Sequence, residues 1–267
     1  MKSTTPSVPC TVAILTHNSA RTLRRALESV SNFSDIIVCD GNSTDATLDI
    51  ARAYGARILK QDRAFLTTEG RIQNFSGIRN QTLRAAVHDW FFFLDSDEYI
   101  RLDLQDEIAK VVHMEPCAYW IPRIYEYKGK DIDCSVAYPS QQMRLFNKKV
   151  ATHFIKEVHE RIELRPGTVP LWLTSPMFVP LPDTVEELVR KWQGYLLLER
   201  GRRKPITARE WLRSSTHDAG VAVLYTLRLA RILLFSKGTR LPVSYEIARI
   251  WYQLVLIKDS FTMIRSV

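Results

Sequence analysis

Short apolar runs alternate with helical patterns through the first sixty residues. Residues 12–15 read as a buried strand, and a helical repeat of apolar positions then runs to Val30. Residues 35–40 and 56–59 repeat the strand pattern around a second helical stretch, which Thr44 could cap. A β-α-β-α-β series with continuously apolar strands predicts an α/β fold: a mostly parallel, Rossmann-like sheet with helices on both faces.

The strongest apolar run of the chain, residues 90–94, separates this regular part from a less regular one. Residues 71–87 before it read as a helix that Gly77 can interrupt, and residues 102–112 after it read as another helix. Further extended stretches are expected at residues 118–127, 141–146 and 155–164.

From residue 184 onward the pattern is helical. Three helices are expected there, at residues 185–200, 220–236 and 243–258. The predicted organisation is therefore an α/β domain over residues 1–182, with halves at about 10–100 and 101–182, followed by a helical segment over residues 183–267.

The positive charge of the chain is concentrated in that helical segment. The 267 residues carry a formal net charge of +8, and residues 183–267 alone hold 15 Lys and Arg against 8 Asp and Glu, a net of +7. The same segment is rich in aliphatic and aromatic residues, which favours an anionic membrane surface as partner over a nucleic acid.

The last two predicted helices are amphipathic. In the first of them, Arg228 and Arg231 share one stripe of an otherwise apolar helix, and central arginines disfavour a membrane-spanning placement. In the second, Glu246, Arg249 and Gln253 form a polar stripe opposite a broad apolar face. Both patterns suit helices lying in a membrane interface, and they equally suit helices packed on the α/β domain.

The cysteine pattern and the N-terminus indicate the compartment. Cys10 and Cys39 lie in apolar strand patterns, and no C-x-x-C pair occurs, which predicts buried free thiols in a reducing environment. Residues 1–9 are polar and show no secretory signal. We therefore expect a cytoplasmic protein that is peripheral on the inner face of the cytoplasmic membrane.

Polar residues follow three predicted strands at the point where each strand ends. These are Thr16, Asp40 and Asp95. In open parallel sheets, ligands bind beyond the carboxyl ends of the strands, so the three side chains are expected to face one crevice.

The sharpest local feature is the pair Asp95 and Asp97. In an extended segment, alternation puts both carboxylates on the same side, where they can share a divalent cation that neutralises a diphosphate. The competing interpretation is a turn whose carboxylates cap the following helix. The position directly after a very apolar strand favours the metal site.

The loop after the first strand limits the kind of nucleotide site. Residues 16–20 contain no glycine, so they form no G-x-G-x-x-G loop, and the chain has no P-loop motif. Asp40 stands where dinucleotide-binding folds place an acidic residue for the ribose. This pattern indicates a nucleotide held at strand ends, with its phosphates held by a metal.

Four segments in fixed order carry a family resemblance: "ILTHN", "VCDGNSTDAT", "SGIRNQTL" and "FFFLDSDE". Over residues 10–100 the chain resembles the donor half of the family 2 glycosyltransferases of the GT-A fold, which transfer a sugar from a nucleotide donor with inversion. The resemblance implies nucleotide-sugar contacts by Thr16, Asn18, Asp40, Arg79 and Asp95, and a metal contact by Asp97. The implied cofactor is Mn²⁺ or Mg²⁺.

Weaker matches continue downstream. Arg144-Leu145-Phe146 and Val158-His159-Glu160 resemble segments of bacterial members that build lipopolysaccharide core or related envelope glycans. By this resemblance Arg144 contacts the acceptor or a phosphate. The Q-x-x-R-W signature of processive synthases is missing, which favours addition of a single sugar.

An inverting transfer needs one carboxylate to accept the proton of the acceptor hydroxyl, and Glu160 is the candidate. His159 is a candidate for the metal shell or a phosphate contact. If the segment is extended, these two neighbours point to opposite sides, so both can act only if the backbone turns there. The competing interpretation is that residues 156–161 are a solvated charge run.

The sequence thus predicts a metal-dependent inverting glycosyltransferase that uses a nucleotide-sugar donor, in first place a UDP-sugar. The expected acceptor is a membrane-associated glycolipid of cell-envelope glycan synthesis. Two alternatives stay open: transfer to a polyprenyl phosphate, and a non-catalytic module that binds nucleotide sugars or serves as a membrane scaffold.

Overall fold

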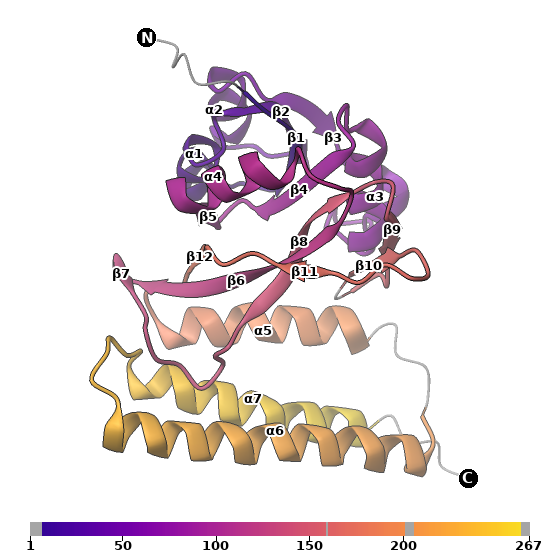
Figure 1. Ribbon diagram of the computed structural model, residues 1–267. Coiled ribbons are helices and arrows are strands. Elements are labelled where there is room, and N and C mark those ends of the chain that lie inside the picture. The colour runs from indigo at the N-terminus through magenta and orange to yellow at the C-terminus, as the bar shows by residue number, and fades with distance from the viewer. Residues whose placement is uncertain (1–6, 159, 201–205, 263–267) are drawn as a thin grey trace. The chain divides into compact units, whose positions relative to one another are not determined.

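The computed structural model describes residues 7–158, 160–200 and 206–262 (Figure 1). The chain forms two compact units. Unit 1 comprises Met1–Arg123 and Gln141–Val179, and unit 2 comprises Ile124–Ser140 and Pro180–Val267. Residues 124–140, which the sequence pattern placed in the α/β domain, thus share a unit with the C-terminal helices.

A parallel four-stranded sheet forms the centre of unit 1. Its strands are β1 (Val8–Thr16), β2 (Phe33–Asp40), β3 (Arg57–Lys60) and β4 (Trp90–Asp95), in the order β3-β2-β1-β4. All the residues of β4 before its final Asp95 are buried. This explains its continuous apolar sequence, since a parallel strand covered on both faces has no solvated side.

Antiparallel strands extend this sheet beyond β4. They are β8 (Gln141–Asn147), β6 (Ala118–Tyr127), β12 (Met177–Pro180) and β5 (Tyr99–Ile100). The short β7 (Lys130–Asp131) pairs antiparallel to β6, whereas the short β11 (Leu171–Trp172) pairs parallel to it. A separate hairpin joins β9 (Ala151–Ile155) and β10 (Arg161–Leu164). Residues 155–164, predicted as one extended stretch, are therefore interrupted by a turn.

Helices cover both faces of the parallel sheet (Figure 1). On one face, α1 (Ala20–Glu28), α2 (Thr47–Ala53) and α4 (Leu102–Val111) pack their apolar side chains against Val12, Ile14 and Phe92. On the other, α3 (Phe75–Ala85) and the β9–β10 hairpin enclose Phe91, Phe93 and Phe154. The predicted α/β fold is confirmed.

Two local predictions about helix starts are wrong. Thr44 caps no helix, because α2 begins at Thr47 and the Thr44 N–H donates instead to Asn18 Oδ1 at 2.8 Å. Gly77 does not interrupt a helix, because it lies in the first turn of α3. The N-cap residue Asn74 accepts a hydrogen bond from the Gly77 N–H at 2.7 Å and fixes that start. The short 3₁₀ helix η1 (Arg63–Phe65) precedes α3.

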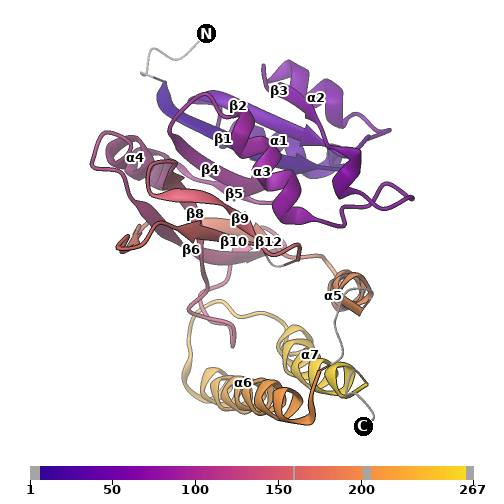
Figure 2. The same cartoon turned by 90° about the vertical axis from the view of Figure 1, so that its right-hand side faces the viewer.

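The described residues of unit 2 form three helices: α5 (Val185–Arg200), α6 (Ala208–Phe235) and α7 (Val243–Phe261). The second is longer than its apolar pattern predicted, because Thr207 and Glu210 form a capping box that starts it at Ala208. Helices α6 and α7 lie side by side (Figures 1 and 2), and α5 meets α7 through the rings of Trp192 and Tyr252, 4.9 Å apart. Within the described residues we find no helix that could span a lipid bilayer.

Candidate active site

The three polar strand ends lie along one edge of the parallel sheet. Strand β1 runs between β2 and β4, with Thr16 beside Asp40 and Leu15 beside Asp95. The loops after β1 and β4 also meet, because the hydroxyls of Ser19 and Ser96 lie 2.9 Å apart. Parallel pairing in this register therefore gathers the motif residues from segments that are far apart in the sequence.

Asp40 organises the first two loops. Its carboxylate accepts hydrogen bonds from Thr16 Oγ1 at 3.0 Å, from the Ser43 N–H at 2.8 Å and from Ser43 Oγ at 2.5 Å. Ser43 Oγ in turn accepts from the Asn18 N–H at 2.8 Å. Asp40 is 4% exposed, so these bonds compensate the burial of its charge. Ser43 was not singled out from the sequence, although it lies inside the second motif.

Five charged residues form a network beside this edge. Arg79 Nη2 lies 2.5 Å from Asp95 Oδ1, and Arg79 Nε lies 3.3 Å from Glu160 Oε1. Arg144 Nη2 lies 3.1 Å from Asp95 Oδ2 and 3.0 Å from the Glu98 carboxylate. The structure therefore brings together Arg79, Asp95, Arg144 and Glu160, all four of them predicted site residues.

The guanidinium groups of this network are held rigidly. Arg79 and Arg144 are 2% and 3% exposed, and each guanidinium carbon lies 4.7 Å from the centre of the Phe93 ring. A third guanidinium, of Arg123, lies 3.4 Å from Glu98. Buried arginines require compensating charge, and the three carboxylates of Asp95, Glu98 and Glu160 supply it.

The network fixes the ionisation of Asp95. Burial by itself raises the pKa of this carboxyl, but the charges of Arg144 and Arg79 outweigh it and hold the pKa well below its ordinary value. Glu98 differs, because burial raises its pKa and Arg144 offsets this only in part, while the negative charge of Asp95 adds to the rise. Asp95 is therefore ionised at neutral pH.

Residues 95–98 form a turn, not the extended segment that the alternation argument required. The Glu98 N–H donates to the Asp95 carbonyl at 3.0 Å, and the Asp95 N–H donates to Glu98 Oε2 at 3.1 Å. The competing capping interpretation also fails, since the N-cap of α4 is Arg101, without a side-chain cap. Glu98 was missed as a site residue, although it belongs to the fourth motif.

Few side chains at these strand ends could bind a metal ion. Within the described parts of the chain, no group of three or more His, Cys, Asp or Glu side chains could hold a metal ion. Asp95 is engaged by two arginines, Asp97 is half-buried in the turn, and His159 lies outside the described residues. Mg²⁺ is usually bound through one or two carboxylates together with substrate phosphates. A cation at this turn would therefore take most of its ligands from a diphosphate.

Glu160 reaches Arg79 because the β9–β10 hairpin is attached to α3. The Asn80 side chain exchanges two hydrogen bonds with the Phe154 backbone, at 2.7 and 2.9 Å, and the Phe75 N–H donates to the Glu157 carbonyl at 2.8 Å. The Glu160 side chain is 18% exposed. Glu160 is therefore not part of a solvated charge run, whereas Lys156, Glu157 and Arg161 are exposed.

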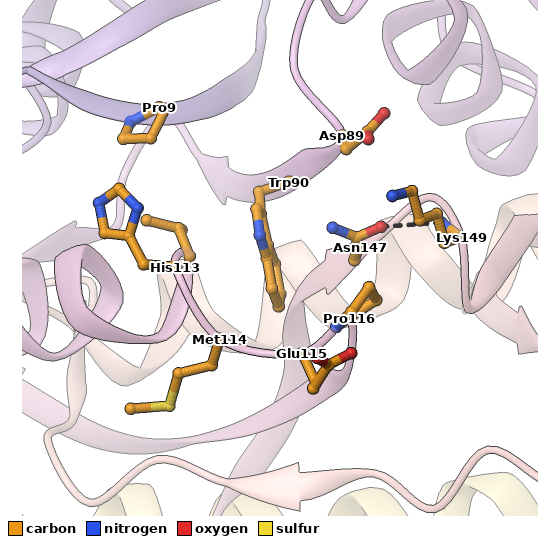
Figure 3. Close-up of a pocket in the computed structure, with 10 residues that line it drawn as sticks. Pro9, Asp89, Trp90, His113, Met114, Glu115, Pro116, Asn147 and Lys149 are labelled. Carbon is orange, nitrogen blue, oxygen red and sulfur yellow. Dashed lines mark hydrogen bonds between the residues drawn. The ribbon is translucent and has the colours of Figure 1, made fainter.

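A separate hollow lies away from these motifs. It measures about 730 Å³ and opens near the amino ends of β1 and β4 (Figure 3). Its lining includes Trp90, His113 and Lys149, and none of the predicted site residues. The candidate site is therefore the open edge at the carboxyl ends of the strands.

Comparisons with known proteins agree with the motifs. An uncharacterised glycosyltransferase of Rickettsia typhi is 31% identical over 144 residues, which cover 52% of this chain and 46% of that protein. The SPbeta prophage-derived glycosyltransferase SunS of Bacillus subtilis is 29% identical over 165 residues, 60% of this chain and 35% of SunS. The matched region thus spans about half or less of the length of these relatives.

Among solved structures, S. aureus TarS 1–349 in complex with UDP-GlcNAc matches with a TM-score of 0.46 and 14% identity, covering 96% of this chain and 73% of TarS 1–349. The family model described as glycosyl transferase family 2 matches residues 11–161, more than half of the chain. The chain therefore belongs to glycosyl transferase family 2.

Proposed function

We propose that this protein transfers one sugar from a UDP-sugar to a membrane-associated glycolipid, with inversion, in the synthesis of a cell-envelope glycan. The observation that carries the proposal is the meeting of Asp40, Asp95, Arg79 and Glu160 at one edge of a parallel sheet in a family 2 chain. Polar groups at such an edge are suited to hold a nucleotide.

The donor is held by the loops that Asp40 organises. Thr16 and Asn18 border the nucleotide, and the Asp40 carboxylate keeps both loops in place for the uracil or ribose. Arg79 and Arg144 hold Asp95 through one carboxylate oxygen each, so its orientation toward a ribose or phosphate is fixed before the donor binds.

The diphosphate is the leaving group. Asp97, with His159 as a second candidate, would hold Mn²⁺ or Mg²⁺, which when bound neutralises the charge that develops on the departing diphosphate. Arg144 contributes further positive charge near Asp95. Glu160 accepts the proton of the acceptor hydroxyl, and its ion pair with Arg79 orients the carboxylate for that step.

The proposed membrane partner is inferred from the positive charge of unit 2. The segment 183–267 carries the net charge of +7, which suits the anionic inner face of the cytoplasmic membrane, where a glycolipid acceptor resides.

The test is turnover of a panel of UDP-sugars by the full chain, with and without Mn²⁺. Asp97→Ala should lower metal-dependent hydrolysis or transfer by about a hundredfold or more, because the cation supplies several kcal/mol of stabilisation to the transition state. Asp106→Ala, which removes an exposed carboxylate of α4, is the matched control and should leave turnover unchanged. Unchanged turnover in Asp97→Ala would refute the metal assignment.

Glu160→Gln in the same assay separates binding from chemistry. We expect kcat for transfer to fall by roughly 10² to 10⁴ with little change in donor affinity, since a general base acts on the acceptor proton alone. Loss of donor binding with kcat retained would show that Glu160 serves the donor site and is not the base.

A further inference from the structure

Helix α7 packs with its polar stripe inward. Glu246 is 2% exposed and accepts hydrogen bonds from Ser135 Oγ at 3.3 Å and from the Val136 N–H at 3.4 Å. The Arg249 guanidinium lies 4.5 Å from the centre of the Tyr125 ring, and its side chain is 12% exposed. The polar stripe of α7 is therefore buried within unit 2, although a surface helix normally exposes such a stripe to water.

The apolar stripe of α7 is turned outward. Ile247 and Leu254 are each 53% exposed, and Trp251 is 44% exposed. A helix on the surface of a globular domain normally buries such a stripe and exposes the opposite one. The arrangement in α7 is the reverse.

Helix α6 shows the same reversal. Val223, Leu227 and Leu234 recur at helical spacing and are 60%, 64% and 73% exposed, whereas the buried positions of the helix are Ser215 and Ala222. Arg228 points inward and donates to the Val136 carbonyl at 3.0 Å. Arg228 and Arg231 share one stripe in the sequence, but of the two only Arg231 is exposed.

A groove opens where the two helices meet their connecting turn. It measures about 640 Å³, and its apolar walls include Leu229, Ile232, Leu233 and Val243. The basic side chains of Lys128, Lys130 and Arg240 also line it.

Hydrogen bonds hold the two sides of this groove together. The Asp133 N–H donates to the Thr239 carbonyl, and the Thr239 N–H donates to Asp133 Oδ2 at 2.7 Å. Next to the groove, Phe235 at the end of α6 is 75% exposed, and Lys237 in the turn that follows is also exposed. A fixed apolar groove is thus combined with a cluster of cations.

The apolar groove and its cations together indicate which kind of molecule binds there. Contiguous apolar surface on a protein marks a contact with another molecule. A second copy of the chain, related by a two-fold axis, would present the same positively charged surface and so would not neutralise these cations. An anionic phospholipid leaflet supplies both an apolar phase for the exposed side chains and phosphates for the lysines.

We propose that the α6–α7 end of unit 2 is a membrane-docking surface, in which the exposed apolar side chains enter the leaflet, the groove takes a lipid chain, and Lys128, Lys130 and Arg240 bind headgroup phosphates. The proposal refines the membrane partner of the proposed function and assigns it to particular residues. The net charge of the whole tail is then less important than the cations at this end.

The charge test compares two matched double variants of the full chain. Lys128→Gln with Lys130→Gln should weaken binding to vesicles of equal parts phosphatidylglycerol and phosphatidylcholine by about twenty-five-fold, since each basic residue at an anionic leaflet contributes about fivefold. Lys110→Gln with Lys149→Gln removes the same charge from exposed positions of unit 1 and should leave binding unchanged. Equal losses in both variants would overturn the proposal, because only net charge would then matter.

The apolar test is Leu227→Gln with Leu234→Gln. Because both side chains are exposed, the melting temperature should stay the same, while vesicle binding should fall by at least about tenfold. Unchanged vesicle binding would overturn the proposal. So would a wild-type dimer that these substitutions dissociate, since the surface would then belong to a second copy.

UDP-sugar hydrolysis, measured on the same proteins without lipid, reports on unit 1. Hydrolysis that is equal in wild type and in all three variants, together with selective loss of vesicle binding, supports the docking surface. Absence of hydrolysis in every protein would refute the proposed activity, and the vesicle measurements would still decide the docking surface.

Discussion

The substitution Glu98→Gln tests whether the buried charge network stabilises the folded protein at the candidate site. Glu98→Gln keeps the shape of the side chain and removes its charge. The wild-type network has three guanidiniums, of Arg79, Arg123 and Arg144, and three carboxylates, and Glu98 is 3% exposed. After the substitution, two carboxylates remain to balance three guanidiniums, of which those of Arg79 and Arg144 are buried.

Removal of one partner from a buried ion pair costs about 3 to 5 kcal/mol of the free energy of unfolding. Burial raises the pKa of Glu98, so its ionised form is itself costly, and we expect a loss near the lower end, about 3 kcal/mol. The measurement is urea unfolding at pH 7, followed by tryptophan fluorescence.

Glu107→Gln is the matched control. Glu107 accepts hydrogen bonds from the N–H groups of Thr174 and Ser175 at 2.9 and 2.8 Å. Its loss should cost about 1 kcal/mol, as for a hydrogen bond that stays partly satisfied by the amide. If Glu98→Gln costs no more than Glu107→Gln, Glu98 is protonated in the folded protein, and the charge-balance reasoning is refuted.

Two further predictions concern the free energy of unfolding. Burial raises the pKa of Asp35, but hydrogen bonds from Arg57 and Thr11 outweigh it and lower the pKa. The stabilisation that ionised Asp35 gives the folded protein is therefore complete above the unfolded pKa of about 3.9, and it is lost as the pH falls through the lower folded pKa. Asp35→Asn should thus flatten the acid side of a plot of the free energy of unfolding against pH. An unaltered slope would contradict this prediction. Gly77→Ala should cost about 1 to 3 kcal/mol, because a Cβ there would lie 2.4 Å from the Phe65 ring. Gly194→Ala in α5 is the control, because an added Cβ there meets no atom within 4 Å. It should raise the free energy of unfolding by roughly 0.5 to 1 kcal/mol, measured by thermal or urea unfolding. Equal effects of the two substitutions would contradict the packing argument.

The local elements were largely predictable from the sequence. Strand β6 spans the predicted residues 118–127, and α5 spans the predicted residues 185–200. Apolar periodicity determines such elements, because each buries one face or both. The start of α6 was missed, since its first turns carry polar residues and depend on the capping box at Thr207. The apolar strand patterns likewise placed Thr16, Asp40 and Asp95 at strand ends.

The contacts between distant segments were decided by the tertiary structure alone. Arg79 and Glu160 are 81 positions apart, and Arg144 and Asp95 are 49 apart, so no local pattern could pair them or show that Glu98 completes the network. The sequence also showed that α7 has a polar and an apolar stripe, but not which one faces inward. That depended on Ser135 and Val136, which hydrogen-bond Glu246 from a different segment of unit 2. Periodicity fixes the faces of an element, whereas the partners that compensate buried charge fix its orientation.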